Sequence, residues 1–202
     1  MGDIEKILQF IVEVEKLKGV LRKTRPVGFG RYENSAEHSW HVCLLALMLK
    51  DYAHESVNID RVIRMLLIHD VGEIDAGDTI VYASENSDVT DRERAGIKRI
   101  FNMLPAQQTQ EYETLWEEFE AGESPDAVFA KAIDRVPPLL HNLYGEGHSW
   151  RDNGVSVEQV LQVNSRIACA NDQLWLTLKQ KIDVAKSDGL FGTEPNKGED
   201  QP

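Results

Sequence analysis

The sequence predicts an all-α protein, and three observations lead to that class. Apolar residues recur every three or four positions through most of the chain, which is the spacing of amphipathic helices. Alternation of apolar and polar residues, the pattern of strands, is scarce. The chain also contains no internal repeat of the kind that builds solenoids. We therefore expect one bundle of packed helices.

The N-terminal part holds three expected helices. Residues 4–21 place their aliphatic side chains on one helical face. A loop with proline and glycine follows, and it carries four basic residues and no acid: Arg22, Lys23, Arg25 and Arg31. Ser35 is the expected N-cap of a helix over residues 36–53. A short buried helix is predicted from Ile59 to Asp70.

The rest of the chain is also expected to be helical. Helices are predicted over residues 90–103 and 105–121, and from Ser124 or Pro125 to Asp134, where the following Pro137-Pro138 pair must end or kink the helix. Residues 145–154 are expected to form a loop, and a long helix from Val157 or Asn164 to Lys186 completes the fold. We place a single domain at residues 1–186 and a disordered tail at residues 187–202, which are polar and rich in glycine.

Composition limits the partners and the compartment. A length of 202 residues suits one domain, and the formal net charge of −12 disfavours nucleic acid polymers and anionic membranes. The longest apolar run, Val42 to Leu49, is too short to span a bilayer, and the N-terminus lacks the basic region of a signal peptide. Cys43 and Cys169 form no C-x-x-C motif. Two buried, reduced thiols in the cytoplasm are the expected state.

The adjacent pair His69-Asp70 is the strongest indication of function. It follows directly on an apolar helical run, and an imidazole nitrogen beside a carboxylate suits a divalent metal if other helices supply further ligands. His38 and Asp134 are the candidates for that role. Each residue alone is more often structural, so the prediction depends on their joint occurrence. The set leaves positions for water and substrate and admits one divalent transition metal: Co, Mn, Zn, Fe or Ni.

Three ordered motifs resemble those of the HD-domain metal-dependent phosphohydrolases, specifically the small single-domain branch that includes 5′-deoxynucleotidases. The motifs are ENSAEHSWH (Glu33 to His41), LLIHDVGEIDAGD (Leu66 to Asp78) and AKAIDR (Ala130 to Arg135). The resemblance extends from about Ile4 to Lys181. The nucleotidases usually have an arginine next to an aromatic residue upstream of the first metal histidine, where this chain has Arg22-Lys23-Thr24.

The resemblance implies a fold, a set of functional residues and an assembly. The fold is a single-domain helical bundle of the HD-domain type, and the assembly is a homodimer. The implied metal ligands are His38, His69, Asp70 and Asp134. The implied acidic catalytic pair is Glu73 and Asp78.

Residue spacing supports the acidic pair independently. Glu73 lies four residues after His69, so both face the same groove if the helix persists for another turn. Asp78 can approach the same metal-bound water. Two close carboxylates in one cavity have their pKa values driven apart, which suits an acid and a base, although the spacing does not assign either role.

The other histidines bear on how many ions are bound. His41 lies three residues after His38 and is a candidate ligand of a dinuclear centre. The binuclear relatives use an additional histidine pair between the HD pair and the last aspartate, and no histidine occurs here between His69 and His141. One ion is therefore expected. His54, His141 and His148 are expected to lie in the core or to face solvent.

The expected reaction is hydrolysis of the phosphomonoester of (deoxy)nucleoside 5′-monophosphates by a metal-activated water, with Arg22 and Lys23 holding the phosphate. The same scaffold suits a nucleotide pyrophosphate or a cyclic phosphodiester, because pocket shape decides. A non-catalytic, metal-stabilised regulatory module is the alternative of another class, and Glu73 and Asp78 argue against it. An oxygen-using di-iron relative would need the missing histidine pair.

Overall fold

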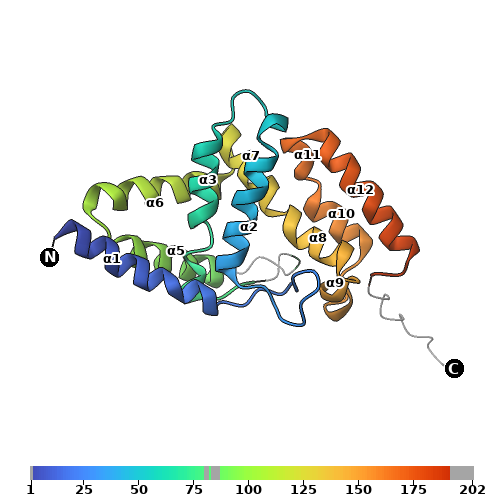
Figure 1. Ribbon diagram of the computed structural model, residues 1–202, viewed down its shortest axis with the longest axis horizontal. Helices are drawn as coiled ribbons and strands as arrows, with labels where there is room; N and C mark the ends of the chain where they lie inside the picture. The colour runs from blue at the N-terminus through green and yellow to red at the C-terminus, as the bar shows by residue number, and fades with distance from the viewer. Residues whose placement is uncertain (1, 80–81, 83–86, 192–202) are drawn as a thin grey trace.

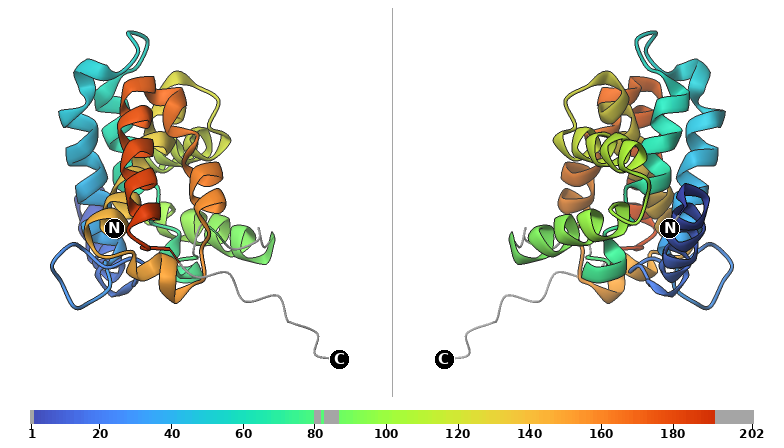
Figure 2. Two further views of the ribbon diagram at one scale, coloured as in Figure 1. Left: turned by 90° about the vertical axis from the view of Figure 1, so that its right-hand side faces the viewer. Right: turned by 90° about the vertical axis from the view of Figure 1, so that its left-hand side faces the viewer.

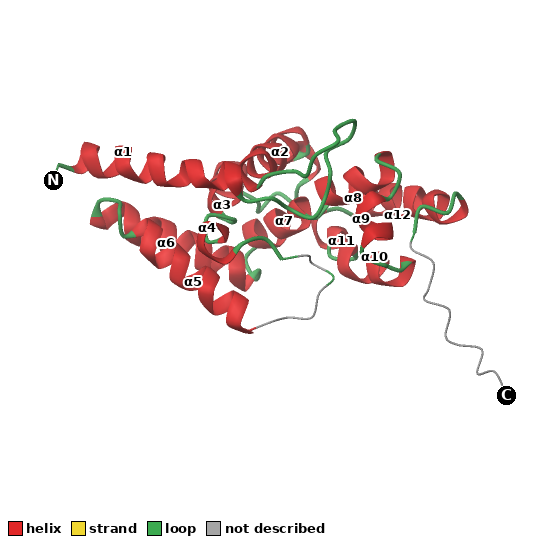
Figure 3. Ribbon diagram, turned by 90° about the horizontal axis from the view of Figure 1, so that it is seen from below, coloured by secondary structure: helices red, strands yellow, loops and turns green. Residues whose placement is uncertain are grey.

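The structure is a computed structural model that describes residues 2–79, 82 and 87–191. Every regular element in this part of the chain is a helix (Figure 3), which confirms the predicted all-α class. The first elements are α1 (Asp3–Val14), η1 (Glu15–Gly19), α2 (Ser35–Met48), η2 (Lys50–Tyr52), α3 (Ile59–Ile68), α4 (Glu73–Ala76), α5 (Ser87–Phe101), α6 (Ala106–Ala121) and α7 (Pro125–Asp134). They are followed by α8 (Val136–Tyr144), α9 (His148–Asp152), α10 (Val157–Asn164), α11 (Ile167–Ala170) and α12 (Asp172–Ser187).

Helices α2, α3 and α7 lie at the centre of the molecule (Figure 1). The end-on views of Figure 2 show α10 and α12 at one end and α5 and α6 at the other. One hydrophobic cluster joins the first seven helices and includes the fully buried Met65 and Ile133, while a second joins α8 to α12 around Trp150. Leu45 of α2 and Leu174 of α12 pack against both clusters, so the two cores are connected.

Helix α2 begins one residue earlier than the sequence predicts. Asn34, not Ser35, is the N-cap, because Asn34 accepts a hydrogen bond from the Glu37 backbone and the Glu37 side chain accepts one from the Asn34 backbone. This reciprocal capping box needs an acid or amide three residues after the cap, a condition that Asn34 meets and Ser35 does not. The Ser35 hydroxyl is thereby free to face the functional site.

The predicted break after Asp134 is confirmed. The hydroxyl of Ser124 caps α7 by accepting a hydrogen bond from the Ala127 backbone, and Pro125 occupies the first turn. Helix α7 ends at Asp134, and Pro137 and Pro138 lie in the first turn of α8, where missing N–H groups are tolerated. The break places Asp134 at a helix end that faces α2 and α3.

The C-terminal part differs from the predicted loop and single long helix. Residues 148–152 form the short helix α9. Helices α10, α11 and α12 replace the one helix, because Ser156 caps α10 and Asn171 caps α12 by accepting hydrogen bonds from the backbone three residues on. The apolar periodicity continues across these caps, so periodicity alone did not reveal the breaks.

The boundary of the predicted tail at residue 187 is also too early. Ser187 belongs to α12, the Leu190 backbone donates a hydrogen bond to Ala185, and the Phe191 ring stacks on Trp150 with centroids 4.5 Å apart. The apolar side chains of residues 190 and 191 cover the second core. The rest of the predicted tail, residues 192–202, lies outside the described residues. Among the described helices, none has the length and apolarity that a bilayer crossing requires.

Candidate metal centre and adjoining pocket

Three of the predicted metal ligands converge from three helices. His38 lies in the second turn of α2, His69 caps the end of α3, and Asp134 is the last residue of α7. Oδ1 of Asp134 lies 2.8 Å from Nε2 of His38 and 3.4 Å from Nε2 of His69. One ligand atom from each residue lies within 4.8 Å of the other two, so the three groups can hold one metal ion.

The orientation of the His69 ring is fixed by its other nitrogen. Nδ1 lies 2.8 Å from the carbonyl oxygen of Leu66, an acceptor, so Nδ1 carries the proton and donates it. Nε2 is buried and has no hydrogen-bond partner. Its lone pair therefore faces the carboxylates of Asp70 and Asp134, which is an arrangement that requires a cation or a proton between them. The residues fit a bound metal ion.

Asp70, the fourth predicted ligand, lies at the edge of this group. Its Oδ1 is 3.0 Å from Nε2 of His69, while its Oδ2 accepts a 2.7 Å hydrogen bond from Nη1 of Arg22. The Trp116 indole donates to the carbonyl of His69 and fixes the backbone at this position. One oxygen of Asp70 thus faces the candidate metal position while the other is held by a cation.

Burial and charge act in opposite directions on the pKa values of these groups. Burial alone would raise the pKa of Asp70, but the charges of His69 and Arg22 outweigh it and bring the value to about 2. Burial opposes ionisation of Asp134 too, yet the hydrogen bond with His38 and the close approach of His69 hold the pKa of Asp134 well below its usual value. Burial lowers the pKa of His69, and Asp70 and Asp134 raise it well above the usual value. The two carboxylates are therefore ionised at neutral pH.

The predicted acidic pair lies next to this group. The guanidinium of Arg22 is 3.8 Å from Oε1 of Glu73 and 3.9 Å from Oδ1 of Asp78, and the Ser35 hydroxyl donates a 2.5 Å hydrogen bond to Oε2 of Glu73. Gly77 ends α4 with φ +76°, a conformation that favours glycine, and this turn leads the chain to Asp78. The structure thus brings together the acids that the sequence separates by one short helix.

Both acids hold their protons more strongly than usual. Burial raises the pKa of Glu73 well above its ordinary value, and the negative charge of Asp70 adds to the effect. Burial also raises the pKa of Asp78, although the charge of Arg22 partly offsets it. Each of these two carboxylates therefore keeps a proton to a higher pH than it would in water.

A further carboxylate, Glu93, approaches the site from α5. Gly72 makes this approach possible, because a Cβ at that position would lie 2.7 Å from Cγ of Glu93 and 2.8 Å from its backbone oxygen. Burial and the charges of Glu120 and Asp70 raise the pKa of Glu93 to about 7. No motif or spacing in the sequence indicated that this residue lies near the site.

A cavity of about 210 Å³ opens beside these groups. Its charged lining includes Arg22, Lys23 and Arg135 together with Asp70, Glu73, Asp78 and Asp134. Asn142, Ser149 and Asn164 supply neutral polar groups, and Pro138 and Leu139 supply apolar surface. The combination of charge at the carboxylates and neutral polar groups elsewhere suits a small molecule with one charged part and one uncharged part.

The two predicted phosphate-binding residues are placed differently. Arg22 is largely buried and lies against several carboxylates, so its charge is already balanced by the protein. Lys23 lines the cavity, where its ammonium group can meet a ligand. Arg135, which the sequence did not single out, also lines the cavity, and its buried Nε has no hydrogen-bond partner.

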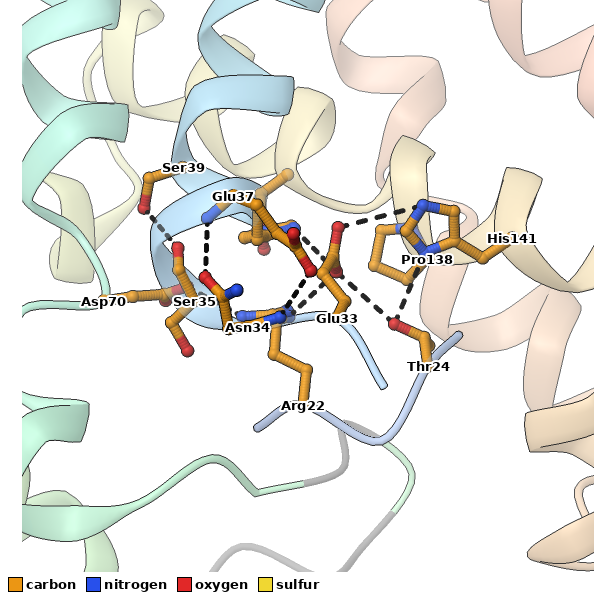
Figure 4. A network of polar contacts seen from close by, with 12 residues as sticks. Arg22, Thr24, Glu33, Asn34, Ser35, Glu37, Ser39, Asp70, Pro138 and His141 are labelled. Atoms are coloured by element: carbon orange, nitrogen blue, oxygen red, sulfur yellow. Dashed lines mark hydrogen bonds and ion pairs between the residues drawn. The ribbon is translucent and has the colours of Figure 1, made fainter. Parts of the chain in front are cut away.

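Sequence reasoning missed a group of residues behind His38. Oε2 of Glu33 lies 3.4 Å from Nδ1 of His38 and 3.5 Å from Nε of Arg22. On its other side, Glu33 approaches Thr24 and His141 (Figure 4). His141 lies in the core, one of its two expected positions, but the potential metal ligands beside it were not predicted from the sequence. The only signal in the sequence was the position of Glu33 in the first motif.

Fold and site together define a class of helical proteins in which histidines and aspartates from three helices surround a candidate cation position beside a polar pocket. A family model described as "HD domain" matches residues 14–175. The chain belongs to the HD-domain family, which confirms the resemblance and the predicted bundle type.

Several proteins similar to this chain are named as nucleotidases. The human 5′-deoxynucleotidase HDDC2 is 30% identical over 142 residues, which cover 66% of this chain and 65% of that protein. The 5′-deoxynucleotidase YBR242W of Saccharomyces cerevisiae is 29% identical over 141 residues, which cover 66% and 58% of the two chains. The matches thus span slightly less than two thirds of the length of these relatives.

Solved structures support the fold over nearly the whole chain. A Magnetospirillum magnetotacticum protein described as a predicted metal-dependent phosphohydrolase is 43% identical, with a TM-score of 0.90, and the match covers 95% of this chain and 96% of that one. An HD-domain phosphohydrolase from Listeria innocua is 20% identical, with a TM-score of 0.61 over 91% and 89% of the chains. The second similarity concerns the fold alone.

Proposed function

We propose that this protein is a metal-dependent phosphohydrolase that cleaves the phosphomonoester of (deoxy)nucleoside 5′-monophosphates. The observation that carries the proposal is the shared cavity, which brings Asp70, Asp134, Glu73 and Asp78 together with cationic side chains. The names of the relatives support the substrate class. The similarity to a protein described as a metal-dependent phosphohydrolase and the cluster of His38, His69 and Asp134 support the cofactor.

The candidate metal ligands are His38, His69, Asp70 and Asp134, and mixed imidazole and carboxylate donors suit one borderline divalent ion such as Co, Mn, Zn, Fe or Ni. When bound, such an ion supplies positive charge that lowers the pKa of a water and neutralises phosphoryl oxygens. The His69 ring has its Nδ1 proton committed to Leu66, so its Nε2 is oriented for ligation in advance.

The protein's own groups handle the protons and the phosphate. In the proposed reaction one of Glu73 and Asp78 takes a proton from the attacking water, and the other gives a proton to the departing nucleoside oxygen. Ser35 holds Glu73 in position through its 2.5 Å hydrogen bond. Lys23 and Arg22 neutralise the phosphate oxygens, with Arg22 exchanging part of its contact with the carboxylates for contact with substrate.

A substrate panel tests the proposal. Purified protein is supplied with each of the five metals in turn and incubated with deoxynucleoside and ribonucleoside 5′-monophosphates, cyclic nucleotides and dinucleotide pyrophosphates, and released phosphate is measured. The proposal expects metal-dependent release from the 5′-monophosphates. Cleavage of only the cyclic or pyrophosphate compounds would replace the substrate class, and metal binding without any turnover would support a regulatory module.

We also infer that the chain works as a homodimer. Four large apolar side chains lie exposed on α2 at helical spacing: Trp40, Leu44, Leu47 and Met48, with exposed fractions between 38% and 65%. An exposed apolar helix face of this kind is typical of an interface between identical subunits. Sedimentation velocity of the wild type and of Met48→Glu tests this inference. A dimer that the substitution converts to a monomer supports it, and a wild-type monomer contradicts it.

Of the two cysteines predicted to be buried, Cys43 is buried and Cys169 is exposed. Both are free thiols, which supports a reducing compartment, for which we propose the cytoplasm. Burial raises the pKa of the Cys43 thiol to about 11, so this thiol is unreactive.

A further inference from the structure

A second group of potential metal ligands lies behind His38. Glu33 belongs to the segment before α2, His41 follows His38 by one turn of α2, and His141 belongs to α8. One ligand atom of each residue lies within 4.8 Å of the other two. Glu33 and His141 are only 2% and 5% exposed, and His41 is partly buried. The group is therefore a built site and not a chance meeting of surface side chains.

The hydroxyl of Thr24 sets the protonation of the His141 ring. Oγ1 of Thr24 donates its one proton to Oε2 of Glu33 at 3.4 Å, and Nδ1 of His141 lies 3.4 Å from the same Oγ1 (Figure 4). With the hydroxyl proton directed at Glu33, which can only accept, Oγ1 accepts from His141 and Nδ1 carries the ring proton. Nε2 of the neutral ring then presents a lone pair.

This lone pair faces another acceptor. Nε2 of His141 lies 3.8 Å from Oε1 of Glu33, which is too long for a hydrogen bond. Two ligands that meet a single ion at tetrahedral angles with bonds of 2.0–2.1 Å are roughly 3.4 Å apart. Burial, the largest influence, lowers the pKa of His141, so a proton between the two atoms is disfavoured. A cation between them satisfies both.

His41 supplies the third ligand. Its ring centroid lies 5.9 Å from that of His141, at an interplanar angle of 31°, so the two rings stand side by side. We propose that Oε1 of Glu33, Nε2 of His141 and a ring nitrogen of His41 bind a second divalent transition-metal ion, separate from the HD centre. Two imidazoles and one carboxylate form a set that zinc favours, with one position left for water.

The second site connects to the HD centre through Glu33. Its Oε1 faces His141, while its Oε2 lies 3.4 Å from Nδ1 of His38, whose Nε2 faces Asp134. An ion held by Glu33 fixes this carboxylate, and the carboxylate in turn orients the His38 ring. Glu33 is thus a positioning residue for the HD centre, and the second ion stabilises that position. None of the three ligands lines the substrate cavity.

Metal stoichiometry tests the proposal without reference to turnover. The metal-stripped full chain is incubated with Zn²⁺, freed of excess ion by gel filtration and analysed by mass spectrometry for zinc and protein. We expect two ions in the wild type and one in each of His41→Gln, His141→Gln and Asp134→Ala. His54→Gln is the matched control, because His54 is an exposed histidine that forms a hydrogen bond with Ser56, and this variant should keep two ions.

A spectroscopic readout identifies which site is filled. Asp134→Ala loaded with Co²⁺ should retain the visible absorption of a Co²⁺ site with imidazole ligands, and adding His141→Gln should abolish it. Thr24→Val should weaken the affinity of this site by about tenfold, because the orientation of His141 is lost. Circular dichroism verifies that each variant is folded, and the partly buried His41 gives the mildest variant.

Two results would overturn the second site. The first is that the wild type binds one ion and Asp134→Ala binds none. The second is an unchanged zinc content in folded His41→Gln and His141→Gln, or an equal loss in the His54 control. Failure of the proposed phosphohydrolase activity is a separate outcome, since the measurements here count ions and require no substrate.

Discussion

Nη1 of Arg22 donates a 2.7 Å hydrogen bond to Oδ2 of Asp70, one of the four candidate metal ligands. The same guanidinium lies within 4 Å of carboxylate oxygens of Glu33, Glu73 and Asp78. Arg22 therefore balances the negative charge of the site before any substrate arrives. In the proposed reaction Arg22 both holds Asp70 and contacts the phosphate, which would link substrate binding to the geometry of the candidate metal centre.

Replacing Arg22 should lower stability as well as substrate affinity. In Arg22→Gln, several buried carboxylates lose their counter-charge, and the breaking of a buried ion pair costs about 3 kcal/mol. We expect this loss in urea unfolding at pH 8 with EDTA, and a partial recovery with added Mn²⁺, which neutralises the same carboxylates. Arg25→Gln is the control, because Arg25 makes an exposed 3.5 Å ion pair with Asp152 and its loss should cost less than about 1 kcal/mol. Equal losses in the two variants would contradict the role of Arg22.

Substitutions of Asp70 and of Glu73 should differ in their effects on metal binding and turnover. Asp70→Asn removes a charged candidate ligand and should lose both the ion of the HD centre and the activity. Glu73→Gln should keep the metal and lower kcat by about 10²- to 10⁴-fold, since a group that moves a proton is replaced by one that does not. Metal analysis and phosphate release from a nucleoside 5′-monophosphate are measured on the same samples. Full metal loss in Glu73→Gln would make Glu73 a ligand.

The sequence predicted the bounds of a helix correctly where capping residues or prolines stand at both of its ends. Ser124-Pro125 and Pro137-Pro138 bracket α7, and its predicted bounds agree with the structure. The C-terminal helices were merged, because their caps interrupt the backbone without interrupting the apolar periodicity. Sequence periodicity reports which face is buried, and it is insensitive to a change of helix direction.

The candidate site was predictable only where its residues lie in motifs. His69, Asp70 and Glu73 are close in sequence at the end of one helix, so their proximity in space could be predicted. The contacts of Glu33 with His141, and of Glu93 with the site, depend on how α8 and α5 pack against distant helices. Such contacts arise from tertiary packing, and no spacing rule within one helix contains them.

The contact between Phe191 and Trp150 should make the end of the described chain part of the stable domain. Phe191→Ala removes a stacked ring pair and exposes part of the second core, for which we expect a loss of about 1 to 2 kcal/mol in the free energy of unfolding. Val184→Ala, at a side chain that is 60% exposed on α12, is the control and should change stability by less than about 0.5 kcal/mol. Urea unfolding followed by tryptophan fluorescence measures both. If the urea midpoint of Phe191→Ala is unchanged, Phe191 does not stabilise the domain, and the predicted domain end near residue 187 is the better one.

Glu93 should make stability fall as the pH rises. The pKa of its carboxyl is raised from 4.5 to about 7 in the folded chain, mainly by burial. The folded state therefore binds more protons than the unfolded state between these values, so the stability that the group contributes is fully present below pH 4.5 and is lost as the pH rises through about 7. Glu93→Gln mimics the protonated form and removes this dependence.

Relative to the wild type, Glu93→Gln should gain roughly 1 to 2 kcal/mol between pH 5 and pH 8, less than the full pKa difference implies, because the side chain is partly exposed. Urea unfolding of both proteins in EDTA measures the gain, since a cation near Asp70 would itself lower the pKa of Glu93. Glu117→Gln, at an exposed position of α6, is the control and should follow the wild type at both pH values. If Glu93→Gln loses as much stability between pH 5 and pH 8 as the wild type does, the titrating group is another residue of the site.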